Sequence, residues 1–355
     1  MPDKVFAANI SVSAKSAILI EKSSGKIIWQ KNAKDQRKIA STTKIMTAIC
    51  ALENAPLSKV IATPKEATLT EGTKSYLASG ERAYLSDMLY MLLLESANDA
   101  AVAIAGDISG SCDGFSDLMN EKAREIGLAD TNFENPHGLD TKSNYSCALD
   151  LAKLCSYALD NAEFAKIVST RTYKSTTLDG VTRNLKNHNR LLSLYKGAIG
   201  VKTGYTKSSG RCLVSAAEKD GTTLICVTLD DPDDWNDHIK LFDYGFAHTE
   251  KITLQKGKET VFSVPVVGGK CDRVGAVLQN DMNAVLVLPR GNITQKIFMP
   301  QFLYAPIEKG GKIGKIIFCC DGEEIACASL FAQDRVARKK PENIFVKLFN
   351  FIFRR

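Results

Sequence analysis

The sequence predicts an α+β fold for about the first 250 residues, followed by a smaller all-β domain. Helical patterns fill most of residues 43–126, and strand patterns stand both before and after that helical block. Residues 251–330 instead show short β-rich runs between glycine-rich turns, without helical periodicity. A chain of 355 residues is long enough for two domains that each bury a core.

The first predicted element is a β-hairpin over residues 16–30. An apolar run at 17–20 precedes Ser23, Ser24 and Gly25, and a second apolar run occupies 27–29. Serine and glycine are typical turn residues, so the two runs are expected to pair as neighbouring strands.

Four helical patterns follow the hairpin. Between Thr43 and Glu53, apolar residues recur at spacings of three and four, which gives the segment one apolar face. Comparable patterns predict helices over residues 86–95, 98–108 and 112–126.

The period changes to that of strands after residue 200. Apolar runs at 212–217 and 223–229 flank Lys219, Asp220 and Gly221, which form a strong hairpin signal. We place the end of this α+β domain near residue 250, so that it covers residues 1–250.

The β-rich domain is expected over residues 251–332. Its runs at 259–267, 276–288 and 314–319 are separated by turns that contain paired glycines.

Residues 333–355 form a basic tail that predicts an amphipathic helix. At about 100° per residue, Lys347, Asn350 and Arg354 share a narrow polar arc, and apolar residues cover the rest of 343–353. The run is too short to span a bilayer, and the flanking cations favour anionic headgroups. We expect a membrane-surface anchor. The alternative is a terminal helix docked on the β-rich domain or on a partner.

Composition excludes several classes of protein. Hydrophobic residues make up 45% of the chain and charged residues 24%, which excludes intrinsic disorder. Lys and Arg outnumber Asp and Glu by only 46 to 40, so no nucleic-acid partner is indicated. The 10 cysteines and 4 histidines show no zinc-ligand spacing, which favours buried small residues over a metal site. We expect no metal and no cofactor.

Ser41 and Lys44 are the first candidate catalytic pair. They lie three residues apart at the start of a predicted helix, so they share a face and bring an amine within reach of a hydroxyl. The same Ser-x-x-Lys pattern occurs at Ser23 and Ser193, so the motif alone is weak. An N-capping serine followed by a surface lysine is the alternative interpretation.

Two further triplets strengthen the pair. Ser96 and Asn98 stand at the junction of two helical patterns, where side chains can point into a cleft. Lys202, Thr203 and Gly204 precede the strand hairpin and predict an edge strand whose glycine allows a substrate backbone to approach closely. The order Ser-x-x-Lys, Ser-x-Asn, Lys-Thr-Gly is typical of penicillin-binding proteins and class A β-lactamases.

On these motifs the sequence closely resembles the low-molecular-mass penicillin-binding proteins that are serine-type D-alanyl-D-alanine carboxypeptidases. The resemblance extends to the segments 40–48, 98–103, 135–140 and 187–192, and it covers roughly residues 15–330. It implies a transpeptidase/β-lactamase-like domain with a five-stranded sheet and helices. It also implies that the β-rich domain lies between catalysis and the membrane.

The resemblance implies removal of the terminal D-Ala from peptidoglycan pentapeptides that end in D-Ala-D-Ala. Ser41 is then the nucleophile, and Lys44 is its base if burial and the nearby cation of Lys202 keep the amine uncharged. Ser96 relays the proton to the leaving nitrogen, and Asn98 orients Lys44 and the substrate amide. β-Lactam antibiotics mimic this substrate and acylate the same serine.

Further residues surround this predicted centre. Lys202 and Thr203 would bind the free carboxylate of the substrate. By analogy with the family, the backbone N–H groups of Ser41 and Tyr205 form the oxyanion hole. His137 is expected to support the loop that borders the site rather than to act in the chemistry. Arg190 and Arg211 are further carboxylate contacts that we do not favour.

The substrate implies an exported enzyme on the extracytoplasmic face of the bacterial cell membrane. The chain start lacks the apolar core of a secretory signal, so we expect the numbering to begin after a removed signal.

Two other functions compete with this one. A class A β-lactamase would need a Glu-x-x-Leu-Asn segment, and the dipeptide Leu-Asn does not occur in the chain. The other is a catalytically silent module that binds peptidoglycan or senses β-lactams. All three catalytic motifs are intact in this chain, so nothing in the sequence indicates that it is inactive.

Overall fold

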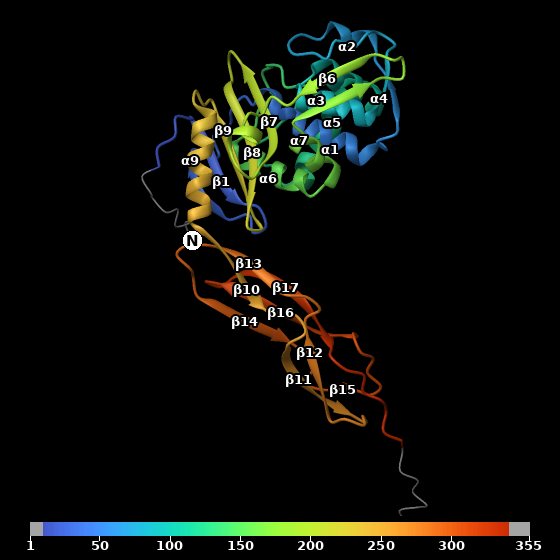
Figure 1. Cartoon of the computed structure of the whole chain (residues 1–355), viewed down its shortest axis with the longest axis vertical. Coiled ribbons are helices and arrows are strands. Elements are labelled where there is room, and N and C mark those ends of the chain that lie inside the picture. Colours follow the sequence, from blue (N-terminus) through green and yellow to red (C-terminus); the bar gives the residue numbers. More distant parts are fainter. Residues whose placement is uncertain (1–9, 341–355) are drawn as a thin grey trace, which may run out of the picture. The chain divides into compact units, whose positions relative to one another are not determined.

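The computed structural model describes residues 10–340 (Figure 1), which form two compact units. The first unit ends at Thr249 and the second begins at Glu250. Among the described residues, none of the helices combines the length and the apolar character that crossing a lipid bilayer requires.

The first unit contains a five-stranded antiparallel sheet in the order β2-β1-β9-β8-β7. Its strands are β1 (Ser16–Glu21), β2 (Ile27–Lys31), β7 (Ala198–Thr206), β8 (Gly210–Lys219) and β9 (Thr222–Leu229). The register places Leu19 opposite Cys226, so the amino-terminal hairpin joins strands about 200 residues later in the chain. The prediction of an α+β domain with a five-stranded sheet is confirmed.

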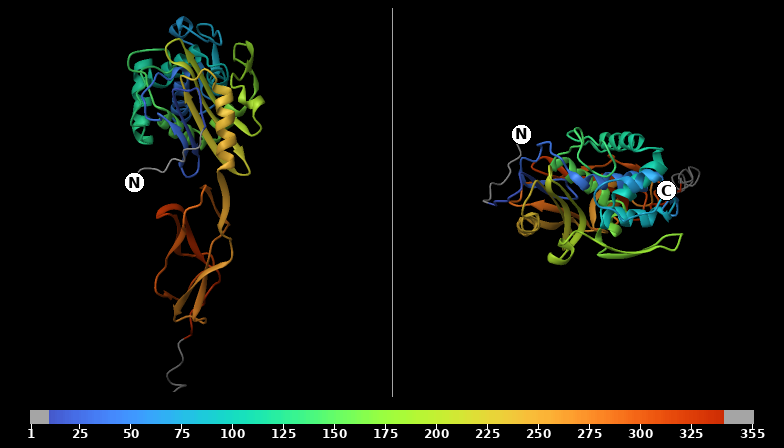
Figure 2. Two further views of the ribbon diagram at one scale, coloured as in Figure 1. Left: turned by 90° about the vertical axis from the view of Figure 1, so that its left-hand side faces the viewer. Right: turned by 90° about the horizontal axis from the view of Figure 1, so that it is seen from above.

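Helices cover both faces of this sheet. Helix α9 lies along one face, against β8 and β9, and α6 packs on the same strands from the opposite face (Figures 1 and 2). The helical elements are η1 (Ala40–Thr43), α1 (Lys44–Asn54), α2 (Lys65–Leu69), α3 (Leu85–Leu94), α4 (Asn98–Ser109), α5 (Cys112–Ile126), α6 (Ala148–Leu159), α7 (Ala162–Ser169), α8 (Leu191–Leu194) and α9 (Asp234–Ala247).

Two short pairs of antiparallel strands complete the first unit. Strand β3 (Val60–Ala62) pairs with β4 (Arg82–Tyr84), and β5 (Thr172–Thr176) pairs with β6 (Thr182–Lys186). The four predicted helices are present as α1, α3, α4 and α5, with ends that differ by at most one residue.

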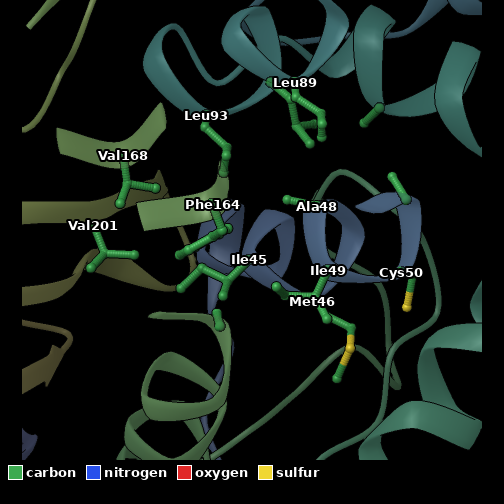
Figure 3. Packing of buried hydrophobic residues seen from close by; sticks show 14 of the residues in the cluster. Ile45, Met46, Ala48, Ile49, Cys50, Leu89, Leu93, Phe164, Val168 and Val201 are labelled. Atoms are coloured by element: carbon green, nitrogen blue, oxygen red, sulfur yellow. The ribbon is translucent and has the colours of Figure 1, made fainter. Parts of the chain in front are cut away.

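Helix α1 passes through the middle of the core. All of its residues from Lys44 to Ala51 are buried. Figure 3 shows Ile45 and Ile49 of α1 among Leu89 and Leu93 of α3, with Phe164 of α7 pointing toward Ile45. Since Lys44 is the first residue of this buried helix, its amine enters the interior of the unit.

The second unit is all-β over its described residues. Its main sheet has the order β14-β16-β17-β12-β11-β15, and β10 pairs with β13 beside it. The strands are β10 (Thr249–Gln255), β11 (Thr260–Val267), β12 (Arg273–Val277), β13 (Met282–Val287), β14 (Ile293–Phe298), β15 (Leu303–Tyr304), β16 (Lys312–Cys320) and β17 (Glu323–Ala332).

The β-rich unit includes the first residues that sequence analysis assigns to the tail. Val336 is buried and pairs with Ile307, and the Lys339 N–H donates to the Gly268 carbonyl at 2.8 Å. The predicted amphipathic helix at 343–353 lies outside the described residues.

The cysteines behave mostly as buried small residues. All 10 are free, and 7 of them are buried, which confirms the prediction for that majority. It is wrong for Cys271 and Cys327, which are exposed. Burial raises the pKa of Cys50 and of Cys212 to about 12, so these thiols stay protonated.

We expect Phe164→Ala to destabilise the first unit by about 3–5 kcal/mol, because the ring is fully buried beside α1 and truncation leaves a cavity. Chemical denaturation followed by circular dichroism measures this change. The control is Leu69→Ala, whose side chain is 71% exposed and whose effect should stay within about 0.5 kcal/mol. A loss below 1 kcal/mol for Phe164→Ala would contradict the packing described.

Candidate active site

Ser41 lies in the single 3₁₀ turn η1 that leads into α1. Its side chain is partly exposed, whereas Thr42, Thr43 and Lys44 are buried. The sequence predicts a helix start here. The structure places Ser41 in the preceding turn, so it is not an N-capping serine, since the residue that caps α1 is Thr43. The hydroxyl therefore stands at the surface of a buried helix start.

The Lys44 amine connects three segments of the chain. Its Nζ lies 3.0 Å from the Ser41 hydroxyl and 2.6 Å from Asn98 Oδ1, and it also donates to the His137 carbonyl. The last two partners can only accept, so a neutral amine uses both of its N–H bonds on them. Its lone pair is then left for the Ser41 hydroxyl, which is the geometry that a base needs.

Asn98 is held in place by the loop before α4. Its Nδ2 donates to the Glu71 carbonyl at 2.7 Å, which leaves Oδ1 facing Lys44. The neighbouring Asp99 is fully buried and accepts from the Ser75 and Leu77 N–H groups at 3.1 and 3.0 Å. Asp99 thereby fastens the 71–77 loop to the start of α4. Sequence analysis missed this role, although an acidic residue in a first helical turn is a recognisable signal.

The loop at 135–140 supplies the third partner of Lys44. Asn135 Oδ1 accepts from the N–H groups of His137 and Gly138 at 3.2 and 2.6 Å, which folds the loop into a tight turn. Gly138 has a φ of +85°, and a Cβ there would lie 2.0 Å from the Ala40 carbonyl oxygen. The loop therefore touches the backbone directly before Ser41.

His137 contributes its carbonyl to the site, and the residue is half-buried. Burial is the main reason why the pKa of His137 is lowered to about 3, so the imidazole is neutral at physiological pH. Its Nδ1 accepts from the Leu139 N–H at 3.2 Å, which stabilises the loop. This placement supports the structural role expected for His137.

Strand β7 forms the opposite wall, and it is an edge strand of the sheet as the sequence predicts. Lys202 on this strand is 1% exposed, and its Nζ donates to the Thr203 carbonyl at 2.8 Å. A Cβ on Gly204 would lie 3.1 Å from Ala40 Cβ and from the Ser41 nitrogen. The glycine thus lets β7 approach the turn of Ser41, a reason that differs from the expected approach of a substrate backbone.

The remaining predicted residues lie around this centre without joining the Lys44 network. Thr203 is half-buried and the Tyr205 side chain is 67% exposed on the same edge strand. Ser96 is buried two residues before Asn98. Within the described residues, its hydroxyl makes no hydrogen bond to Ser41 or Lys44.

Two residues beside the centre have backbone conformations that non-glycine residues seldom adopt. Ala40 has a φ of 46° and Ser96 has a φ of 65°. Such residues concentrate at functional sites, where the surrounding structure holds them in place. Ala40 directly precedes Ser41, and Ser96 lies two residues before Asn98.

Burial and a neighbouring charge both favour the neutral form of Lys44. Burial is the main reason why the pKa of Lys44 lies well below its ordinary value, and repulsion from Lys202 lowers it further, while Asp99 acts in the opposite direction. Burial also lowers the pKa of Lys202 to about 7. Lys202 is therefore positively charged below about pH 7, whereas the surroundings of Lys44 favour its neutral amine.

Other candidate groups are engaged elsewhere. Arg211 pairs with Asp234 at 2.7 Å and stacks over Trp235 of α9, so it is held at that helix. In the described part of the chain, one group has metal-ligand spacing, namely Asp130, Cys147 and Asp150. Its Asp150 carboxylate already accepts from the Asp130 N–H at 2.7 Å, and burial raises the pKa of Cys147 to about 11. The hydrogen bond from Asp130 to Asp150 thus joins the chain at residue 130 to the start of α6.

Comparison with known proteins finds two family models that match consecutive parts of the chain. Residues 3–233 match the model described as D-alanyl-D-alanine carboxypeptidase. Residues 250–338 match the model described as the C-terminal domain of penicillin-binding protein 5.

Individual relatives align over almost the whole chain. The D-alanyl-D-alanine carboxypeptidase DacF of Bacillus subtilis is 33% identical over 341 residues, which cover 92% of this chain and 87% of DacF. The crystal structure of penicillin-binding protein 5 from Haemophilus influenzae has 26% identity and a TM-score of 0.72, with 93% and 99% of the chains covered. The DacD carboxypeptidase structure from Francisella tularensis has 26% identity and a TM-score of 0.68, with coverages of 94% and 95%.

We expect Gly138→Ala to slow labelling of the protein by a fluorescent penicillin about a hundredfold. The added Cβ collides with the Ala40 carbonyl and displaces both Ser41 and the His137 carbonyl. The matched control is Gly180→Ala, since Gly180 has a φ of +82° but no atom within 4 Å of the added Cβ. The left-handed backbone costs both variants about 1–2 kcal/mol of stability, and the collision adds a further loss in Gly138→Ala alone. Equal labelling rates for the two variants would contradict this account of the loop.

Proposed function

Because the chain belongs to the D-alanyl-D-alanine carboxypeptidase family, we propose that Ser41 is its nucleophile and Lys44 the base. The protein is a serine-type carboxypeptidase that removes the terminal D-Ala of peptidoglycan peptides through an acyl-enzyme, and it binds β-lactams. The observation that carries the residue assignment is the buried Lys44 amine, 3.0 Å from the Ser41 hydroxyl.

The proposed acylation moves one proton through the site. Ser41 Oγ bonds to the carbonyl carbon between the two D-alanines while its proton passes to Lys44 Nζ. The C–N bond then breaks, and the departing D-Ala nitrogen receives a proton by way of Ser96. Water hydrolyses the resulting ester and releases the shortened peptide. The lowered pKa of Lys44 supports the first step, because only a neutral amine can accept this proton.

Lys202 and Thr203 are proposed to bind the terminal carboxylate of the substrate. The charge of Lys202, buried beside the site, supplies the attraction, and the exposed edge of β7 gives the peptide access. A peptide whose second D-Ala carries a free carboxylate therefore binds better than a peptide that extends beyond it. This difference accounts for carboxypeptidase activity rather than cleavage within a peptide.

The oxyanion hole is proposed to consist of the Ser41 and Tyr205 N–H groups. The contact between Gly204 and the Ser41 nitrogen supports this assignment, since it brings the backbone of β7 next to the turn that carries the nucleophile. Asn98 keeps its oxygen toward Lys44, and it is also the proposed contact for the substrate amide.

The enzyme is proposed to act on the outer face of the bacterial cell membrane, held there by the predicted helix at 343–353. The substrate supports this location, because peptidoglycan lies outside that membrane. The composition of the tail supports the attachment, since it combines aromatic and aliphatic residues with flanking Lys and Arg.

We expect Ser41→Ala to abolish both D-Ala release and covalent labelling by benzylpenicillin, because the attacking oxygen is removed. Intact-protein mass spectrometry and peptide mapping would locate one adduct on Ser41 in the native chain. The control is Ser193→Ala, which changes the serine of another Ser-x-x-Lys segment and should label normally. A benzylpenicillin adduct in Ser41→Ala would overturn the assignment.

The pKa values predict a bell-shaped pH dependence of kcat/KM. The rate rises as Lys44 loses its proton, and it falls above about pH 7, by about tenfold per unit, as Lys202 becomes neutral and ceases to attract the carboxylate.

Lys202→Arg tests the alkaline limb of this profile, because a guanidinium keeps its charge over the whole range. In this variant kcat/KM should no longer fall above about pH 7, whatever the overall rate of the variant. A peptide that ends in a carboxamide should also lack this limb with the native enzyme. An unchanged midpoint in Lys202→Arg would show that another group titrates there.

A further inference from the structure

One end of the β-rich unit carries an exposed apolar patch that we call the aromatic tip, namely Val267, Phe302 and Tyr304. These side chains are 47%, 44% and 70% exposed. The rings of Phe302 and Tyr304 meet edge to face with centroids 5.3 Å apart. Val267 stands opposite Tyr304 in the parallel pairing of β11 with β15, so the three residues lie on neighbouring strands. Figure 1 shows β11 and β15 side by side at one end of the unit.

The alternation of these strands shows which side chains the core needs. Val266 is buried in the core of the unit and Leu303 packs against it, whereas their neighbours in the strands point outward. The aromatic tip is therefore not required to build the sheet, and its exposure leaves apolar rings in water without a structural reason.

Cations surround the same end of the unit. The turn after β11 pairs with the last described residues, since the Lys270 N–H donates to the Ala337 carbonyl and Gly269 bridges to Arg338. Exposed Lys270, Arg338, Lys339 and Lys340 thus stand close to the aromatic tip, against one exposed acid in this turn, Asp272. Positive charge with Tyr and Phe rings suits an anionic lipid surface.

The tail emerges beside the aromatic tip. Three residues separate Lys340 from Ile344, the first apolar residue of the predicted anchor, and the four Cα–Cα steps between them reach no more than about 14 Å. If the anchor lies in a membrane interface, the end of the β-rich unit must lie close to that interface as well.

We propose that the aromatic tip inserts into the interface of an anionic lipid bilayer as a second contact beside the tail. This inference rests on the proposed membrane location of the enzyme. The rings enter the headgroup region while the surrounding cations contact lipid phosphates. Two contacts on one unit bind more tightly than either contact alone.

The test uses the full chain with vesicles of phosphatidylethanolamine and phosphatidylglycerol whose acyl chains carry bromine, a fluorescence quencher. Tyr304→Trp should lose emission on these vesicles beyond the loss from the native Trp29 and Trp235. The matched control is Phe262→Trp, whose site is 47% exposed on β11 and about 17 Å along the strand from Val267. Equal quenching of the two variants overturns the proposal.

Affinity gives an independent readout. Phe302→Ser with Tyr304→Ser should weaken binding to these vesicles about tenfold, whereas Phe262→Ser should bind normally. D-Ala release from a soluble peptide should be unchanged in both, which shows that the chain is folded and active.

The outcomes separate this inference from the membrane location on which it rests. If the native chain does not bind the vesicles, both fail. If it binds but the double variant binds equally well, the tail alone makes contact and only the aromatic tip is refuted. A blue-shifted Tyr304→Trp emission that vesicles do not change would mean that the tail or a second copy covers the tip, which also refutes it.

Discussion

The proposed active site depends on one lysine amine that is buried and whose pKa is lowered. In water an amine with a pKa of about 10.4 is almost always protonated at pH 7, so it cannot take a proton from serine. Placing Lys44 at the first position of a buried helix removes the water that stabilises its charge, and Lys202 opposes that charge further. The core around α1 therefore does more than stabilise the fold, because it sets the protonation state on which the chemistry rests.

Close backbone approach positions the base as much as side chains do. One hydrogen-bond acceptor for Lys44 is the main-chain carbonyl of His137. Glycines at 138 and 204 let the 135–140 loop and strand β7 pack closely against the Ser41 turn. With Asn98 Oδ1 as the other acceptor, both N–H bonds of the neutral amine are occupied. The direction of its lone pair follows from these contacts, whereas burial and the charge of Lys202 favour its neutral form.

Sequence patterns predicted the helices and short motifs, which depend on residues close together in the chain. The helices α1, α3, α4 and α5 showed clear apolar periods, and their ends were right to within one residue. The chain order of three short motifs identified the candidate residues. The carbonyl of His137 and the clamp made by Asp99 were not predictable in this way, because a backbone group carries no residue identity and the clamp depends on a loop more than 20 residues away. Strand β14 was also missed. Its side chains are all half-buried or exposed, so the strand does not alternate between buried and exposed residues.

The division of the chain also separates the residues of the proposed chemistry from those of the proposed membrane contact. Every residue assigned to the reaction lies before Thr249, and the aromatic tip and its cations belong to the unit that begins at Glu250. The amine of Lys44 owes its low pKa to groups of the first unit alone. The proposed lipid contact involves none of the groups that set this pKa, so we expect attachment to act on how often the enzyme meets peptidoglycan rather than on the proposed base.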